Sequence, residues 1–323
     1  MPSGALPPKK ASPYVANVNR NKARQMSPRS VVLGALGVIG TLWMLFRLFG
    51  SSSTPKSAPK SVPGMGGSAY AKTVIVTVLD EKADADGPIA DFVKQNRIDY
   101  AKKHGYATFF PSANNYTIKH GSSSWAKVPA LRHAMTLFPE ATYFFNLDPH
   151  TLIMNPTLSI ETHILAKQRL ESLMVTDVPI VPPDSVIKTF AGLKGDRVDF
   201  VITQDREGLS EKSFIIRNGD WAHFFLDAWF DPLYRTYNFQ RAERHALEHI
   251  VQWHGTILAK LALVPQNIMN SYHEKQATAA NDNGIYKPGD FIVNFGDCNQ
   301  KAKGRNCENE MRPYYARSVQ ADL

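Results

Sequence analysis

The first 79 of the 323 residues contain no aspartate or glutamate, because the first acidic residue is Asp80. The nine lysines and arginines in residues 1–70 therefore account for the whole excess of positive charge. The remaining residues carry 28 of the 37 basic residues against all 29 acidic ones, a net charge of −1. A neutral folded part offers no electrostatic basis for binding nucleic acid, so we expect no such partner.

The sequence has only one long apolar run, and it follows the basic N-terminal tail. Residues 31–46 are sixteen apolar or small residues, and the run resumes after Arg47 with Leu48 and Phe49. The side chain of Arg47 can reach the interface, so about twenty residues are available to span a bilayer. We predict a cytoplasmic tail over 1–30 and a retained transmembrane anchor over 31–50. A cleaved signal peptide is the alternative, although the basic segment is long for one and no A-x-A site follows.

Residues 51–71 are rich in serine, proline, lysine and glycine, which is typical of a flexible stem. The order of tail, anchor and stem predicts a single-pass type II membrane protein whose working domain, residues 72–323, lies in a secretory lumen. The sequence Asn115-Tyr116-Thr117 is an acceptor for N-glycosylation, so Asn115 is a predicted glycosylation site.

Cysteine is scarce: Cys298 and Cys307 are the only two. They lie nine residues apart in a polar loop that contains glycine, and a disulfide between them suits an oxidising compartment. Two free thiols are the alternative. No histidine lies between them, which argues against a structural zinc site.

The sequence also lacks a G-x-G-x-x-G motif and a P-loop, the familiar signatures of NAD and ATP binding. Apolar runs alternate instead with amphipathic segments, and this β-α-β-α-β order predicts an α/β fold with a mostly parallel central sheet flanked by helices. The predicted strands are 73–79, 106–110, 143–147, 200–203, 213–216, 261–264 and 291–295, and the predicted helices are 89–104, 125–138, 159–174, 221–229 and 243–258.

The apolar strand 143–147 ends in Asp148-Pro149-His150. In open α/β sheets, ligands bind at the carboxyl ends of strands. Residues two apart can turn toward one ion, and carboxylate with imidazole suits Mn²⁺, which would neutralise a diphosphate leaving group. Taken alone, the motif is weak evidence for a metal site, because an aspartate that caps the following turn is the more usual explanation.

Seven longer stretches of the globular part occur in order over residues 72–311. They are WAKVPA (125–130), FPEATYFFNLDPHTLIMNP (138–156), FVITQD (200–205), SFIIRNGDW (213–221), Glu243 with Ala246-Leu247, VPQNIMNSY (264–272) and GDFIVNFGDC (289–298). Together these stretches resemble glycosyltransferase family 34. This family includes fungal Golgi α-1,6-mannosyltransferases, fungal α-galactosyltransferases and plant xylosyltransferases.

The resemblance implies a GT-A fold and a retaining transfer of mannose from GDP-mannose, with Mn²⁺ as cofactor. The product would be an α-1,6 linkage on the mannan of N-glycans. It further implies a Golgi membrane protein that works with other mannosyltransferase subunits, as in the mannan polymerase II complex. A non-catalytic or weakly catalytic scaffold subunit of such a complex is the second hypothesis.

The resemblance also assigns residues to the donor and metal sites. Asp148 matches the first acid of the family's D-x-D motif, and His150 stands where the second acid usually is. Asn294 stands where many members have a metal-binding histidine. Lys127 fits the family pattern near the donor. We therefore expect Lys127, Asp148 and Asn294 to bind the donor or its cofactor, and Asp148 and His150 to bind the metal.

The expected catalytic residues are Glu243, Gln204 and Asp205, which fit the family pattern, together with Arg244, which stands where the family has a glutamine. Arg244 would bring a positive charge toward the diphosphate and partly replace the metal. Alternatively, it pairs with Glu248 one turn along the same helix.

A competing motif overlaps this helix. The sequence from His245 to His249 is H-x-x-E-H, the inverted zincin signature, which places two histidines on one helical face. The apolar residues between and after them also explain the helix as ordinary core packing. A metallopeptidase is thus a further alternative, and bound zinc would distinguish it from a transferase.

Overall fold

The computed structural model describes residues 41, 64–80, 88–119, 121–183, 185–237, 239–277, 284–296, 298–299 and 304–320. Apart from Thr41, all of them lie in one compact unit, Ala58–Leu323. Among these residues, no helix is both long and apolar enough to cross a membrane. The predicted tail and, except for Thr41, the predicted anchor lie outside the described residues.

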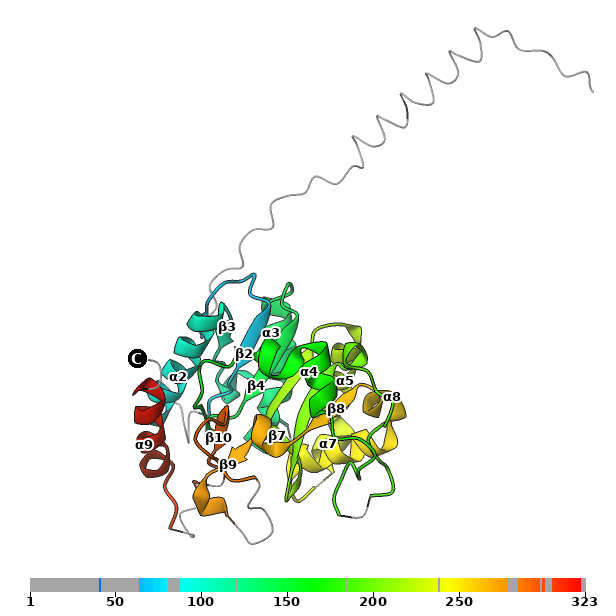
Figure 1. The fold of residues 1–323 in the computed structure, drawn as a ribbon. Coiled ribbons are helices and arrows are strands. Elements are labelled where there is room, and N and C mark those ends of the chain that lie inside the picture. The colour runs from blue at the N-terminus through cyan, green and yellow to red at the C-terminus, as the bar shows by residue number, and fades with distance from the viewer. Residues whose placement is uncertain are drawn as a thin grey trace, which may run out of the picture. The chain divides into compact units, whose positions relative to one another are not determined.

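A seven-stranded sheet forms the centre of the fold, in the order β1-β3-β2-β4-β7-β6-β8 (Figure 1). The pairs β2–β3, β2–β4 and β6–β8 are parallel, whereas β1–β3, β4–β7 and β6–β7 are antiparallel. The α/β class is confirmed, but the sheet is mixed rather than mostly parallel. Its strands are β1 (Met65–Gly66), β2 (Thr73–Val76), β3 (Ala107–Phe109), β4 (Tyr143–Leu147), β6 (Phe200–Asp205), β7 (Gly208–Arg217) and β8 (Leu261–Val264).

A tight hairpin between β6 and β7 is the reason for the mixed sheet. The chain reverses at Arg206 and Glu207, so β7 returns antiparallel and lies between β4 and β6. Gly208 has a φ of 119°, and a Cβ at this position would overlap Oε1 of Glu248. Only glycine therefore fits the start of β7 without a rearrangement.

Helices cover both faces of the sheet, as the alternation of side chains along the strands requires. On β4, Phe144 points into a core shared with α3 (Lys127–Leu137), α5 (Asp220–Trp229) and α7 (Ala242–Trp253). The next residue, Phe145, points into a second core with α2 (Pro88–His104) and α4 (Lys167–Leu173). The apolar strands predicted from sequence thus lie between two helical layers.

A second sheet of three short strands, in the order β5-β10-β9, extends from the end of β4. It comprises β5 (Thr151–Ile153), β9 (Ser271–Tyr272) and β10 (Ile292–Asn294). Beside it, α9 (Cys307–Gln320) packs on α2, and a Cys298–Cys307 disulfide joins the start of α9 to the loop after β10. No local pattern predicted α9, because the segment is polar and contains Pro313.

Several predicted elements are shorter or divided. The predicted helix 125–138 begins as a 3₁₀ turn (Ser123–Ala126), and 159–174 divides into a π-helical turn (Glu161–Leu165) and α4. The predicted helix 243–258 divides at His254 into α7 and α8 (Gly255–Leu258). The predicted stem ends earlier than residue 71, because β1 pairs with β3. The remaining short helices are α6 (Pro232–Thr236) and the 3₁₀ turns Ala113–Asn115, Gly195–Arg197, Gln266–Ile268 and Glu274–Gln276.

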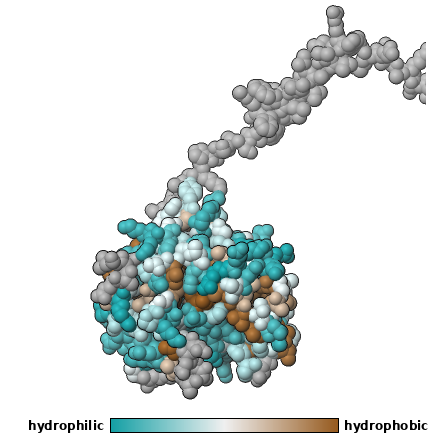
Figure 2. All heavy atoms as spheres, viewed as in Figure 1, coloured by the Kyte–Doolittle hydropathy of each residue, from teal (hydrophilic) through white to brown (hydrophobic). Residues whose placement is uncertain are grey.

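The surface seen in the same view is mainly hydrophilic, with hydrophobic side chains scattered over it (Figure 2). Exposed large apolar side chains include Leu233, Tyr237 and Trp253. Tyr237 contacts the ring of Phe239, and Trp253 contacts that of His249, which in turn contacts Phe239. Asn115, the predicted glycosylation acceptor, is exposed at the end of its 3₁₀ turn.

Candidate active site

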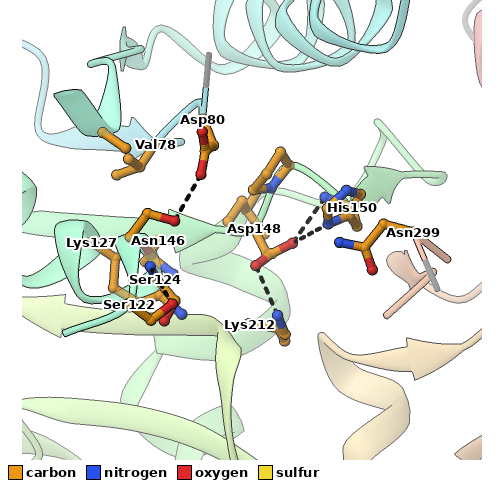
Figure 3. A pocket seen from close by; sticks show the side chains of 14 residues that line it. Val78, Asp80, Ser122, Ser124, Lys127, Asn146, Asp148, His150, Lys212 and Asn299 are labelled. Carbon is orange, nitrogen blue, oxygen red and sulfur yellow. Dashed lines mark hydrogen bonds and ion pairs between the residues drawn. The ribbon is translucent and has the colours of Figure 1, made fainter. Parts of the chain in front are cut away.

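Asp148 lies directly after β4, where the antiparallel pairing with β7 continues for one more residue. The amide of Asp148 donates to the carbonyl of Lys212 at 2.8 Å. This pairing brings the ammonium of Lys212, 64 residues away in sequence, to 3.2 Å from Oδ2 of Asp148. Figure 3 shows Lys212 and His150 each joined to the Asp148 carboxylate. The carboxylate also raises the pKa of Lys212, against the opposing effect of burial, so the ammonium is charged at neutral pH.

The other carboxylate oxygen of Asp148 closes the turn. Oδ1 accepts from the amide of His150 at 2.9 Å and lies 3.3 Å from Nδ1 of the same residue. Burial alone would raise the pKa of Asp148, but Lys212 and His150 outweigh it and hold that pKa well below its ordinary value. Asp148 is therefore a carboxylate throughout the physiological range.

A buried arginine forms hydrogen bonds to the backbone of this turn. The guanidinium of Arg97, on α2, donates to the carbonyl of Asp148 at 3.1 Å and to the carbonyl of Thr151 at 2.7 Å. Its side chain is fully buried. Burial lowers the pKa of Arg97 to about 9, with Asp148 partly opposing the shift, so the group remains charged at pH 7. Arg97 thus fixes the backbone that carries Asp148.

A cavity of about 270 Å³ opens above Asp148. It lies at the carboxyl ends of β2 and β4, the position at which α/β sheets bind ligands. Two lysines, Lys127 and Lys212, line it together with the Asp148 turn. The other lining residues are Val78, Asp80, Ala113, Ser122, Ser123, Ser124, Asn146, Leu147, Pro149, His150 and Asn299.

Lys127 is held in the cavity wall by Glu243, which is 116 residues away in sequence. The ammonium of Lys127 lies 2.9 Å from Oε1 of Glu243, and the hydroxyl of Ser124 donates to Oε2 at 2.6 Å. Both members of the ion pair are almost fully buried. Glu243 therefore fixes Lys127 in position, and Lys127 is the member of the pair that faces the cavity.

Arg244, the next residue on α7, lies among four carboxylates. It forms its closest ion pair with Asp205, and its Nη1 lies 3.3 Å from Glu207. Glu211 and Glu248 are each 3.8 Å from its Nε. Although burial opposes it, Glu211 and Asp205 raise the pKa of Arg244. Of the two alternatives for Arg244, the contact with Glu248 is present, but it is one of four, and Arg244 does not line the cavity described above.

The pKa of Glu248, another member of this cluster, is shifted in the opposite direction from that of Glu211. Burial raises its pKa from 4.5 to about 7, although Arg244 and the amide of Leu209 favour the charged form. Because the folded state binds a proton more readily than the unfolded state, this group stabilises the fold fully below about pH 4.5, and the contribution is lost as the pH rises through 7.

We expect Glu248→Gln to flatten the fall in stability between pH 4.5 and 7, because glutamine accepts the hydrogen bond from Leu209 without carrying a charge. At about pH 8 the free energy of unfolding should rise by on the order of 1–3 kcal/mol. Urea unfolding across this range measures it. The exposed Glu308→Gln is the control, and an unchanged pH profile in Glu248→Gln would contradict the prediction.

Residues 69–305 match the galactosyl transferase GMA12/MNN10 family. The chain belongs to this family of glycosyltransferases. An uncharacterized alpha-1,2-galactosyltransferase of Schizosaccharomyces pombe is 30% identical over 311 residues, which cover 90% of this chain and 92% of that protein. The match extends beyond the folded core described here. The family assignment confirms the resemblance seen in the sequence.

Two relatives from Saccharomyces cerevisiae are named as mannosyltransferases and not as galactosyltransferases. The probable alpha-1,6-mannosyltransferase MNN10 is 31% identical over 248 residues, 73% of this chain and 62% of that protein. The probable alpha-1,6-mannosyltransferase MNN11 is 28% identical over 264 residues, 76% of this chain and 61% of that protein. The chain spans less than two thirds of the length of either mannosyltransferase.

Two of the residues expected in this glycosyltransferase site point elsewhere. Gln204 donates to the carbonyls of Pro179 and Ile180, both at 3.0 Å, and so anchors the loop before β6. The amide nitrogen of Asn294 donates to Asn270 at 2.6 Å, and its oxygen accepts from the amide of Gly296 at 2.7 Å. Both ends of the Asn294 side chain are therefore used within the fold.

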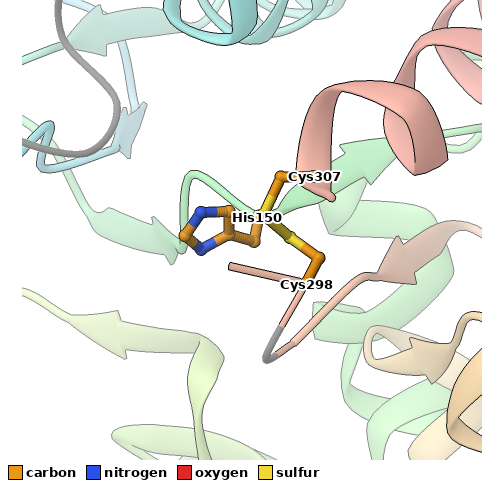
Figure 4. A group of neighbouring side chains, drawn as sticks. All are labelled: His150, Cys298 and Cys307. Carbon is orange, nitrogen blue, oxygen red and sulfur yellow. A yellow bond between two sulfur atoms is a disulfide. The ribbon is translucent and has the colours of Figure 1, made fainter. Parts of the chain in front are cut away.

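His150 lies beside the disulfide between Cys298 and Cys307 (Figure 4). Within the described part of the chain, these three residues are the only group of three or more potential ligands close enough to share a metal ion. The two sulfurs are bonded to each other, so they offer no thiolate. Asp148 is paired with Lys212, and the Asn294 side chain is used. The residues present therefore do not fit an open manganese site.

The inverted zincin motif does not form a metal site either. Glu248 contacts Arg244 and accepts from the amide of Leu209. The ring of His249 packs at a tilt against Tyr234 and Trp253 at the surface. Among the described residues, no third ligand joins this pair of histidines. The motif arises from the helical spacing of core and surface residues.

Sequence reasoning missed Arg97, Glu211 and Lys212. The segment from Gly208 to Lys212 is polar, so the strand was predicted to begin only at Ser213. The signal that could have found it is the hairpin: a turn at Asp205–Gly208 extends both flanking strands to the turn. Nothing in the sequence pairs Arg97 with the Asp148 turn.

Proposed function

We propose that this chain is a retaining glycosyltransferase that transfers mannose from GDP-mannose in α-1,6 linkage onto N-glycan mannan. The observation that carries the proposal is the cavity at the strand ends, with Lys127 and Lys212 in its wall. The family assignment supports glycosyl transfer, and the similarity to two alpha-1,6-mannosyltransferases supports mannose as the sugar.

The two lysines suit the chemistry of a nucleoside diphosphate sugar. When the bond between the sugar and the diphosphate breaks, negative charge grows on the leaving phosphate. Ammonium groups fixed in advance at that position stabilise this charge without reorganising. Asp148 and Glu243 hold the two ammonium groups in place. Manganese has no open ligand set among the described residues, so the proposal includes no step that depends on it.

A nucleotide-activated galactose is the second candidate donor. The relative that is 30% identical is named an alpha-1,2-galactosyltransferase, and the match covers 92% of its length. Neither Lys127 nor Lys212 distinguishes the two donors, because both would contact the diphosphate. Discrimination must come from groups that contact the sugar and the base.

The proposal also places the chain in the Golgi membrane as a type II protein with its globular domain in the lumen. Residues 31–50 would be the anchor, and the chain would work with other mannosyltransferase subunits. The basic tail and the apolar run at residues 31–50 support the membrane setting, and the similarity to two mannosyltransferases supports work beside other mannosyltransferase subunits. In the alternative, a scaffold subunit, the cavity would bind no nucleotide sugar.

The decisive experiment uses the whole chain purified in detergent. The protein is incubated with a mannan acceptor and with either radiolabelled GDP-mannose or radiolabelled UDP-galactose. We expect label to enter the acceptor from GDP-mannose at a rate at least about tenfold above that from UDP-galactose, which corresponds to about 1.4 kcal/mol of discrimination. Linkage analysis of the product should give α-1,6-mannose. Preferred use of UDP-galactose would show that the donor is a nucleotide-activated galactose and not GDP-mannose. Binding of neither donor would favour the scaffold subunit.

A further inference from the structure

We infer that the ammonium of Lys212 is the cation that faces the donor diphosphate, and that donor binding needs no divalent metal. The inference rests on the proposed use of a nucleoside diphosphate sugar. It assigns Lys212 as a donor-binding residue and Asp148 as the residue that positions it.

The position of Lys212 is fixed by the sheet. Because β4 and β7 pair antiparallel, the backbone of Lys212 lies opposite Asp148, and its side chain emerges beside the carboxylate. The side chain is 30% exposed, whereas that of Asp148 is 10% exposed. The charged end of Lys212 therefore lies at the cavity wall beside Asp148, which also lines the cavity.

The ion pair between Lys212 and Asp148 also disfavours the binding of a metal ion at Asp148. A divalent cation on Oδ2 of Asp148 would lie beside an ammonium that is already 3.2 Å from that oxygen, and like charges at this range repel strongly. The second oxygen, Oδ1, already accepts the amide of His150 at 2.9 Å. Each oxygen of the carboxylate that would hold the metal therefore already has a hydrogen-bond partner.

Lys212 has the chemistry that the diphosphate requires. An ammonium carries three N–H donors, and the hydrogen bond to Asp148 uses one of them. Glu211 lies 3.9 Å from the same ammonium. Lys127 supplies a second fixed ammonium in the same cavity wall, which also contains Asp80 and Asp148.

The test compares the full-length wild type with Lys212→Met and Lys212→Arg. The first measurement is the binding of Mn²⁺ to the nucleotide-free protein, followed by electron paramagnetic resonance. We expect no bound manganese in the wild type or in Lys212→Arg, and about one bound ion in Lys212→Met, because Asp148 then lacks its cation. Manganese bound by the wild type at the Asp148 site would overturn the inference, whether or not nucleotides bind.

The second measurement is calorimetric titration with GDP and with UDP, in EDTA or in manganese chloride. We expect the wild type to bind equally well in both solutions. In EDTA, Lys212→Met should bind about 10–100-fold more weakly, the range for one lost charged hydrogen bond. In Lys212→Met, manganese should restore part of the affinity. Lys167→Met, which removes an exposed lysine paired with Asp196 at 2.8 Å, is the control and should leave affinity unchanged.

The outcomes separate the two proposals. Wild-type binding that EDTA abolishes would overturn the role of Lys212 and leave the proposed function standing. Nucleotide binding that Lys212→Met leaves unchanged in EDTA would also overturn it. Absence of nucleotide binding by the wild type in both solutions would refute the proposed function itself. If Lys212→Met fails to fold by circular dichroism, Lys212→Arg and the wild type still decide the outcome through their response to EDTA.

Discussion

Arg244→Met is expected to lower the free energy of unfolding by about 3–5 kcal/mol, the range found when one partner of a buried ion pair is removed. Arg244 is almost fully buried and is the cation shared by Asp205, Glu207, Glu211 and Glu248. Without it, several carboxylates remain close together and mostly out of water. Urea unfolding near neutral pH measures the loss.

The loss should also depend on pH with a defined sign. Carboxylates left without Arg244 bind protons more readily in the folded variant than in its unfolded state, so the variant loses stability as the pH rises. The deficit relative to wild type should therefore be larger at about pH 8 than at about pH 5.5. Arg312→Met, which removes an exposed i,i+4 pair with Glu308, is the control and should cost less than about 1 kcal/mol. A pH-independent deficit in Arg244→Met would show that packing, not charge, dominates.

Arg97→Met should lower the free energy of unfolding by about 2–4 kcal/mol, because a lost donor leaves buried carbonyls under-satisfied. The guanidinium donates to the carbonyls of Asp148 and Thr151 and to the hydroxyl of Thr151. The substitution should also loosen the turn that carries Asp148 and so weaken nucleotide binding. Thermal unfolding and calorimetric titration measure the two effects.

Two further variants separate these effects. Arg132→Met removes a half-buried arginine that is paired at 2.9 Å with the exposed Asp227. This variant should change the free energy of unfolding by less than about 1 kcal/mol and should leave nucleotide binding unchanged. Arg97→Lys should recover part of the stability, since lysine donates to carbonyls but lacks the planar fork. Full nucleotide affinity in a folded Arg97→Met protein would show that the turn does not depend on this support.

Local patterns determined much of the fold. The β-branched run at β2, the apolar run at β4 and the amphipathic helix α2 were all predicted close to their observed bounds. These elements are set by residues within a few positions of one another, through burial on two faces or one. The prediction was wrong about strand direction, because the hairpin between β6 and β7 depends on Gly208 and a two-residue reversal within a polar segment. It also missed α9, which a disulfide and packing against α2 hold in place.

The sequence alone determined the family, the strand end at Asp148 and the residues that the family pattern marks. Each of these is a property of a short contiguous stretch. Only the tertiary structure decided which charges meet: Lys212 with Asp148, Lys127 with Glu243, and Arg244 with Asp205. The partners are 64, 116 and 39 residues apart. The physical reason is that the antiparallel entry of β7 beside β4 sets the position of Lys212, and the electrostatic character of Asp148 follows from that neighbour rather than from the motif that contains it.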